Sequence, residues 1–157
     1  MIELLIVCTG NICRSPMAET LLRRKLAEHG LGDVHIASAG TGAWDGEPAS
    51  EGAYLVSLEH GLDLSAHRAR LLTRDLVESA HLIFAMSRHH RMRAEQLGGG
   101  SKTHLVGEYA GRTGEDAEVR DPFGGAIEGY RECFAELEVL TDLMVSRLAR
   151  EVSGDQR

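Results

Sequence analysis

Four short apolar runs, separated by segments with helical spacing, constrain the fold of this chain most strongly. The runs occupy residues 4–7, 34–37, 81–85 and 103–106. Apolar runs of this length, with β-branched residues among them, are typical of buried strands. We therefore predict four strands, each with its side chains buried.

The segments between and after these runs carry apolar residues at steps of three and four, as on one face of an amphipathic helix. We predict helices around residues 18–26, within residues 48–60 and along residues 127–148. Strands that alternate with helices form parallel sheets covered on both faces. The sequence thus predicts an α/β fold: three layers with a central, mostly parallel four-stranded sheet flanked by helices. Ligands of such sheets bind beyond the carboxyl ends of the strands.

The chain length of 157 residues is typical of one domain with a real core. We predict a single domain over residues 1–157, with a frayed tail at 153–157. The glycine-rich stretch at 98–101 is expected to be a turn from a helix to a strand rather than an interdomain linker.

Charge, hydropathy and cysteine content narrow the possible partners and compartment. The net charge of −7 disfavours nonspecific nucleic-acid binding, which needs surplus Lys and Arg. No apolar run approaches the ~18 residues that span a bilayer, and Ile2–Val7, interrupted by Glu3, lacks signal-peptide features. Three cysteines do not form a disulfide framework. We expect a cytoplasmic protein that binds neither nucleic acid nor membrane.

Residues 88–93, which include three arginines and two histidines, form the one locally basic patch. Two interpretations stay open: a solvated helix face, or a docking surface for acidic partners. The histidines of the chain show no spacing typical of a metal site. Apart from His67, we expect them at the surface or in packing.

The segment with the clearest chemistry is residues 8–16, CTGNICRSP. It lies between the first predicted strand and the first predicted helix, so its backbone N–H groups can gather at the positive end of the helix and bind an anion. Gly10 permits unusual backbone angles, and Pro16 suits a first helical turn. The order strand, tight loop, helix predicts a phosphate-binding loop.

Two side chains of this loop suit phosphoryl transfer. Cys8 would lie beneath the bound anion, where the same N–H groups favour the nucleophilic thiolate. Arg14 would close the loop and hold two oxygens of a tetrahedral phosphate, and Ser15 could donate a hydrogen bond to the sulfur. A cysteine met alone is more often a small buried apolar residue, so the interpretation depends on this context.

Residues 7–19, VCTGNICRSPMAE, resemble the signature of the low molecular weight protein tyrosine phosphatase family. Further similarity lies at residues 38–41, 65–70 and 121–125 and covers the chain from residue 2 to about 148. The resemblance implies metal-independent hydrolysis of protein phosphotyrosine through a cysteinyl-phosphate intermediate, without a cofactor. Phosphorylated proteins would be the substrates, and we expect a monomer or weak dimer.

The resemblance also assigns roles to single residues. Cys8 would be the nucleophile, Arg14 the phosphate clamp and Asp121, which precedes a proline, the general acid and later the general base. Ser38 and His67 would support the loop through Asn11. Phosphate or substrate would contact the following residues: Thr9, Gly10, Asn11, Ile12, Cys13, Ser15, Trp44 and Phe123.

The two other cysteines have different expected roles. Cys13 would lie near Cys8, so two interpretations stay open: a reversible disulfide that protects the nucleophile, or packing beneath the loop. Cys133 is expected in the core of the last helix.

Two positions, Ile12 and Trp44, and the segment 121–125 bear on substrate preference. Relatives of this family act on phosphotyrosine or, in some bacterial members, on protein phosphoarginine. Ile12, where arginine-directed members have threonine, and Trp44, which matches an aromatic wall residue, both favour phosphotyrosine. The sequence DPFGG at 121–125 resembles bacterial members of both kinds, although Phe123 can still stack on a ring. A protein arginine phosphatase is therefore the alternative.

Two rival functions on this fold are less well supported. An arsenate reductase needs further cysteines to relay a disulfide, and only Cys133 remains for that task. A noncatalytic phosphate-binding adaptor would not need Cys8, Arg14 and Asp121 together.

Overall fold

The central strand of the molecule is the first one, which pairs on both of its edges. β1 (Glu3–Cys8) is parallel to β2 (His35–Gly40) and to β3 (Leu82–Ala85), and β3 is parallel to β4 (Thr103–Leu105). The sheet order is β2-β1-β3-β4. The computed structural model describes residues 2–155. The predicted single α/β domain with a parallel four-stranded sheet is confirmed.

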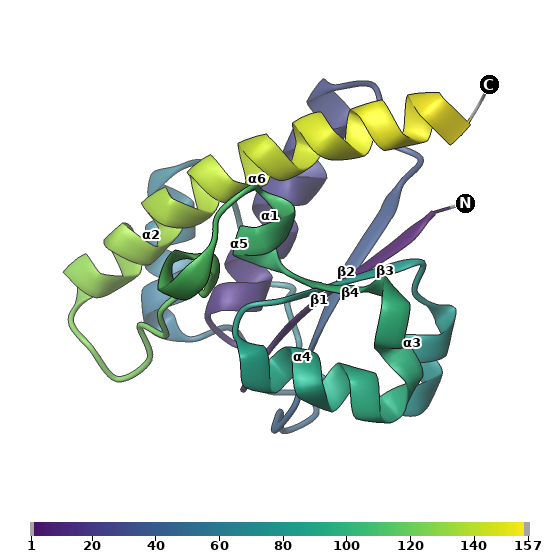
Figure 1. Ribbon diagram of the computed structural model, residues 1–157. Coiled ribbons are helices and arrows are strands. Elements are labelled where there is room, and N and C mark those ends of the chain that lie inside the picture. Colours follow the sequence, from purple (N-terminus) through teal and green to yellow (C-terminus); the bar gives the residue numbers. More distant parts are fainter. Residues whose placement is uncertain (1, 156–157) are drawn as a thin grey trace.

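Helices cover both faces of the sheet and complete three layers (Figure 1). On one face lie α1 (Arg14–Glu28), α2 (Glu51–Glu59), α5 (Val106–Tyr109) and α6 (Ile127–Asp155). On the other face lie α3 (Arg74–Ser79) and α4 (Arg88–Ala94). The long helix α6 packs along α1 and also contacts α2 and α5. The predicted helices at 18–26, 48–60 and 127–148 correspond to α1, α2 and α6.

The side chains of β1 explain why its sequence is continuously apolar. Leu4 and Ile6 belong to the larger core beneath α1 and α6, whereas Leu5 and Val7 belong to the smaller core on the side of α3. Successive side chains of a strand point to opposite faces of the sheet. Cys8, the last residue of β1, lies on the face of the larger core, at the carboxyl edge where α1 begins.

β2 extends three residues beyond its predicted end, to Gly40, and in this extension the polar Ser38 is buried. Ser38 pairs in register with Ile6, and Gly40 with Cys8. A Cβ atom at Gly40 would lie 2.4 Å from the carbonyl oxygen of Thr9 and 2.9 Å from the amide nitrogen of Asn11. Only glycine lets the end of β2 pass this close to the loop after β1.

The glycine-rich stretch forms the predicted helix-to-strand turn. A π-helical turn (Glu95–Gly99) and a 3₁₀ turn (Gly100–Lys102) lead from α4 into β4. Gly98 has a φ of 102°, which L side chains rarely adopt. One further 3₁₀ turn spans Gly114–Ala117. β4 ends at Leu105, one residue earlier than predicted, because Val106 begins α5.

The carboxyl-terminal helix continues to Asp155. The predicted frayed tail at 153–157 therefore begins on helical backbone, and residues 156–157 lie outside the described residues. Within residues 2–155, no helix combines the length and the apolar character needed to cross a bilayer.

Candidate active site

In the loop between β1 and α1, residues 9–13, most of the carbonyl groups accept hydrogen bonds, whereas the N–H groups have no partner among the described residues. Carbonyl oxygens of residues 8, 9, 11 and 12 accept hydrogen bonds of 2.6–2.9 Å from outside the loop. The donors are the backbone N–H groups of Thr41, Gly42 and Ser50 and the ring of His67. Among the described residues, no acceptor bonds the N–H groups of residues 9–13. Such a loop can bind an anion, because several N–H donors remain for it.

Asn11 holds the shape of this loop. With a φ of 57° it is the one non-glycine residue of the described chain with a positive φ, a conformation that asparagine adopts more readily than most other L residues. Its side-chain oxygen accepts the backbone N–H of Arg70 at 2.9 Å, which fixes the orientation of the amide. The amide nitrogen then donates to Ser15 at 2.8 Å and to Ser38 at 2.9 Å.

Ser38 and His67 both contact Asn11 from outside the loop. Ser38 accepts from the side chain of Asn11 and donates to Glu19 Oε1 at 2.5 Å. The Nε2 atom of His67 lies 2.6 Å from the Asn11 carbonyl oxygen, so this ring nitrogen carries a hydrogen and donates it. β2, α1 and the segment before α3 thus all contribute to the position of one asparagine.

Cys8 is buried at the end of β1, with 2% of its surface exposed. Its sulfur lies 2.9 Å from the hydroxyl oxygen of Ser15, in the first turn of α1. Because Asn11 donates to that hydroxyl oxygen, the single hydrogen of the hydroxyl is free to donate to the sulfur. The geometry thus places one hydrogen-bond donor at the sulfur of Cys8.

Arg14, 3% exposed, is held at both terminal nitrogens. Nη1 donates to the carbonyl oxygen of Val119 at 2.9 Å and to Ser87 Oγ at 3.4 Å. Nη2 lies 3.4 Å from Thr9 Oγ1 and 3.4 Å from Asp121 Oδ2. Nε is buried and has no hydrogen-bond partner among the described residues. Since buried donors are almost always satisfied, a bound anion is the natural partner of Nε.

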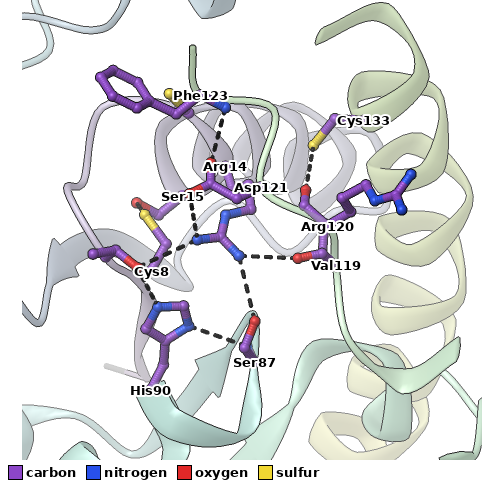
Figure 2. A network of polar contacts seen from close by, with 12 residues as sticks. Cys8, Arg14, Ser15, Ser87, His90, Val119, Arg120, Asp121, Phe123 and Cys133 are labelled. Carbon is purple, nitrogen blue, oxygen red and sulfur yellow. Dashed lines mark hydrogen bonds and ion pairs between the residues drawn. The ribbon is translucent and has the colours of Figure 1, made fainter. Parts of the chain in front are cut away.

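A pocket of about 170 Å³ brings the loop and a distant segment of the chain together. It is lined by Cys8, Thr9, Gly10, Ile12, Cys13, Arg14, Asp121 and Phe123. Asp121 and Phe123 come from the segment before α6, across from the loop (Figure 2). The N–H of Phe123 donates to Asp121 Oδ1 at 3.0 Å, which leaves the other carboxylate oxygen on the side of Arg14. The side chain of Asp121 is half exposed.

Three of the residues predicted to contact phosphate or substrate do not line this pocket. Asn11 and Ser15 are hydrogen-bonded to each other, and Ser15 contacts the Cys8 sulfur. The third is Trp44. It follows β2 on an irregular segment, is 78% exposed and does not line the pocket. Phe123, 64% exposed, is the aromatic side chain at the pocket wall. An aromatic wall formed by Trp44 therefore stays a prediction.

The other two cysteines are buried thiols. Cys13 lines the pocket and donates to Ser50 Oγ at 3.2 Å, and its sulfur lies 3.7 Å from Tyr130 Oη. Burial raises the pKa of the Cys13 thiol. Cys133 packs in the core on α6, and burial raises its pKa to about 12. No disulfide joins any of the three, so the protective role of Cys13 stays a prediction.

Two residues at the amino end of α4, Ser87 and His90, contact the site although the sequence did not predict them as site residues. Ser87 contacts Arg14, and the Nε2 atom of His90 lies 2.7 Å from Thr9 Oγ1. The sequence predicts a surface or packing position for His90. The residue is fully buried, in line with packing, and in addition it makes a polar contact with the loop. A histidine inside a basic stretch gives no signal of this in sequence.

The remaining basic patch at 88–93 is largely paired with acidic side chains. Arg88 contacts Glu118 at 2.8 Å, and Arg91 contacts Glu108 at 3.3 Å. These residues fit the interpretation as a solvated helix face, with His90 as the exception. Within residues 2–155 as a whole, no group of three or more His, Cys, Asp or Glu side chains is placed to hold a metal ion.

The chain is similar to known proteins along nearly its whole length. Residues 3–154 match the family model of the low molecular weight phosphotyrosine protein phosphatases. A protein-arginine-phosphatase of Geobacillus stearothermophilus is 39% identical over 95% of this chain and 97% of its own. Low molecular weight protein-tyrosine phosphatase A of Mycobacterium tuberculosis is 40% identical over 92% of each. A solved low molecular weight protein tyrosine phosphatase from T. tengcongensis superposes with a TM-score of 0.85 at 36% identity, over 93% of this chain and 99% of that one.

Proposed function

The chain belongs to the low molecular weight phosphotyrosine protein phosphatase family, and we propose that it hydrolyses protein phosphotyrosine through a cysteinyl phosphate. The observation that carries this proposal is the arrangement around one pocket of a buried sulfur, the free loop N–H groups and the unpartnered Nε of Arg14. These groups suit a phosphate monoester dianion. The N–H groups and Arg14 can donate hydrogen bonds to its oxygens, while the sulfur attacks its phosphorus.

In the first step the thiolate of Cys8 attacks phosphorus, and the bond from phosphorus to the phenolic oxygen breaks. The leaving oxygen takes a proton from Asp121, which is the carboxyl group on the opposite wall of the pocket. A phenol has a pKa of about 10, so its oxygen leaves far more readily once it is protonated. The loop N–H groups and Arg14 stabilise the charge on the equatorial oxygens.

In the second step the ionised Asp121 takes a proton from water, and the resulting oxygen nucleophile attacks phosphorus. The phosphorus–sulfur bond breaks, inorganic phosphate leaves, and the thiolate of Cys8 is restored. Ser15 assists both steps, because its hydroxyl hydrogen is available to stabilise the sulfur as an anion. Asn11, Ser38 and His67 act one layer further out, where they hold the loop in its anion-binding shape.

The side chains at the pocket wall favour a planar aromatic substrate. Ile12 and Phe123 give the wall two apolar side chains, against which a phenyl ring can pack. Phosphoarginine is the second candidate, because a relative at 39% identity is named a protein-arginine-phosphatase. The two substrates carry the same phosphoryl group, so the loop accommodates both, and the apolar wall decides between them.

Turnover of matched peptides tests this proposal. The purified chain is assayed with phosphotyrosine, phosphoarginine and phosphoserine in one peptide context, with a metal chelator present. We expect phosphotyrosine to be preferred over phosphoarginine by about tenfold or more in kcat/KM, and phosphoserine to be hydrolysed most slowly.

Each alternative has its own result in the same assay. Faster hydrolysis of phosphoarginine would overturn the assignment to tyrosine while leaving the mechanism intact. Loss of turnover in chelator would contradict the mechanism itself. Stoichiometric binding of the phosphopeptide without release of phosphate would instead indicate an adaptor.

A further inference from the structure

The fully buried His90 on α4 has both ring nitrogens in use, although the proposed chemistry assigns it no role. Its Nδ1 accepts the backbone N–H of Ser87 at 3.1 Å, and its Nε2 lies 2.7 Å from Thr9 Oγ1. Thr9 is the first residue of the anion-binding loop. α4 lies on the face of the sheet opposite α1, so His90 links the two layers at the carboxyl edge of the sheet.

The direction of both hydrogen bonds follows from their partners. A backbone N–H can only donate, so Nδ1 of His90 is unprotonated and Nε2 of the neutral ring carries the hydrogen. Nε2 therefore donates to the hydroxyl oxygen of Thr9. Burial, reinforced by the charges of His89 and Arg14, lowers the pKa of His90 to about 3, so the ring stays neutral and keeps this tautomer near neutral pH.

The hydroxyl of Thr9 consequently has little freedom. Its oxygen accepts from His90 and also lies 3.4 Å from Nη2 of Arg14. With both lone pairs used, the hydroxyl hydrogen is the remaining hydrogen-bonding group of a side chain that lines the pocket. It is thus free to donate to an oxygen of the bound phosphoryl group.

Ser87 connects the same network to the other end of the guanidinium. Its backbone N–H donates to His90, and its hydroxyl oxygen accepts from Nη1 of Arg14 at 3.4 Å. Figure 2 shows this chain of contacts from Ser87 through His90 to the loop, with the guanidinium of Arg14 in contact with both of its ends. Both terminal nitrogens of Arg14 therefore contact groups that His90 orders.

We propose that His90 is a positioning residue for phosphoryl transfer: it donates to Thr9, and through Thr9 and Ser87 it orients the hydroxyl and the guanidinium that contact the transferred phosphate. This inference rests on the proposed phosphatase function and deepens it. His90 would affect catalysis through the position of the donors Thr9 and Arg14. The geometry of these donors matters most in the transition state. Loss of the His90 side chain should therefore lower kcat more than it raises KM.

Two substitutions of His90 distinguish a role in positioning Thr9 from a role that is limited to capping α4. In His90→Asn the side-chain oxygen can still accept the N–H of Ser87, but the amide is too short to reach Thr9. In His90→Gln the amide nitrogen can still donate to Thr9, whereas the acceptor for Ser87 is lost. The exposed His29 at the end of α1, changed to Asn, serves as the matched control.

We expect H90N to lower kcat on a phosphotyrosine peptide about tenfold with KM nearly unchanged, and H90Q to stay within about threefold of the wild type. H29N should behave as the wild type. Thr9→Val removes the same contact from the other side, and adding H90N to it should cost no more than about twofold further. Thermal unfolding of each variant verifies that it is folded. If H90N does not fold, T9V still tests the contact between His90 and Thr9.

The opposite pattern would overturn the inference. If H90N kept full turnover while H90Q lost it, His90 would only cap α4, and independent, multiplying effects of H90N and T9V would also contradict coupling through Thr9. Either result leaves the phosphatase function intact, because the wild type still turns over in the same assay. Absence of turnover in the wild type would instead refute the proposed function, and this inference with it.

Discussion

Cys8→Ser is expected to lower turnover of a phosphotyrosine peptide by about 10⁵-fold or more, because a neutral hydroxyl cannot replace the thiolate as nucleophile. Binding of inorganic phosphate, measured by calorimetry, should survive. The loop N–H groups and Arg14 form most of the anion site, and the substitution removes none of them. Loss of one negative charge beneath the anion should favour binding.

The matched control for this variant is Cys133→Ala. Cys133 is also buried but lies in the core on α6, where the one hydrogen bond of its thiol is to the carbonyl oxygen of Arg120, at 3.8 Å. Its turnover should remain close to that of the wild type. If C8S kept turnover within about tenfold of the wild type, or if C133A lost as much as C8S, Cys8 would not be the nucleophile.

Asp121→Asn is expected to lower kcat/KM about 10²–10³-fold for aryl phosphates with poor leaving groups, and by less than about tenfold for those with good ones. The reason is that an amide cannot supply the proton, and only a poor leaving group needs it. The measurement is a series of aryl phosphates of increasing phenol pKa, read as the slope of log kcat/KM. The slope should be shallow in the wild type and steep in D121N.

The exposed Asp116, changed to Asn, is the control for the lost negative charge in this region. It should leave the slope unchanged. Asp121 also lies 3.4 Å from Nη2 of Arg14, so part of any loss in D121N comes from a weakened contact with the clamp. That part affects all leaving groups equally, so equal slowing across the series would contradict the role of general acid.

The fold was predictable because local patterns and the global architecture agree. The run around Leu5 and Val7 is apolar at every position because it contacts cores on both faces of the sheet, which is the pattern of a central parallel strand. The end of β2 was not predictable in this way. Ser38 interrupts the apolar run, and its burial is explained by a hydrogen bond with Asn11 that no local pattern reveals.

The part of the site whose functional side chains lie close together in the sequence was predictable. Cys8, Arg14 and Ser15 fall within one loop and its adjoining helical turn, so the order strand, loop, helix was enough to place them. The carbonyl of Val119, which binds Arg14, has no side-chain signal at all. His90 carries one, but its role depends on a packing of α4 against the loop that is decided by tertiary structure.

The most direct test of the central claim is detection of phosphorus on Cys8 during turnover. The wild type is mixed with an aryl phosphate that has a good leaving group, so that hydrolysis of the intermediate becomes the slower step, and the reaction is stopped in denaturant within the first turnover. We predict a burst of one phenol per active site, and one phosphoryl group on the peptide that contains Cys8. A burst-free reaction without phosphoryl on Cys8, or with the phosphoryl group on another residue, would contradict the mechanism.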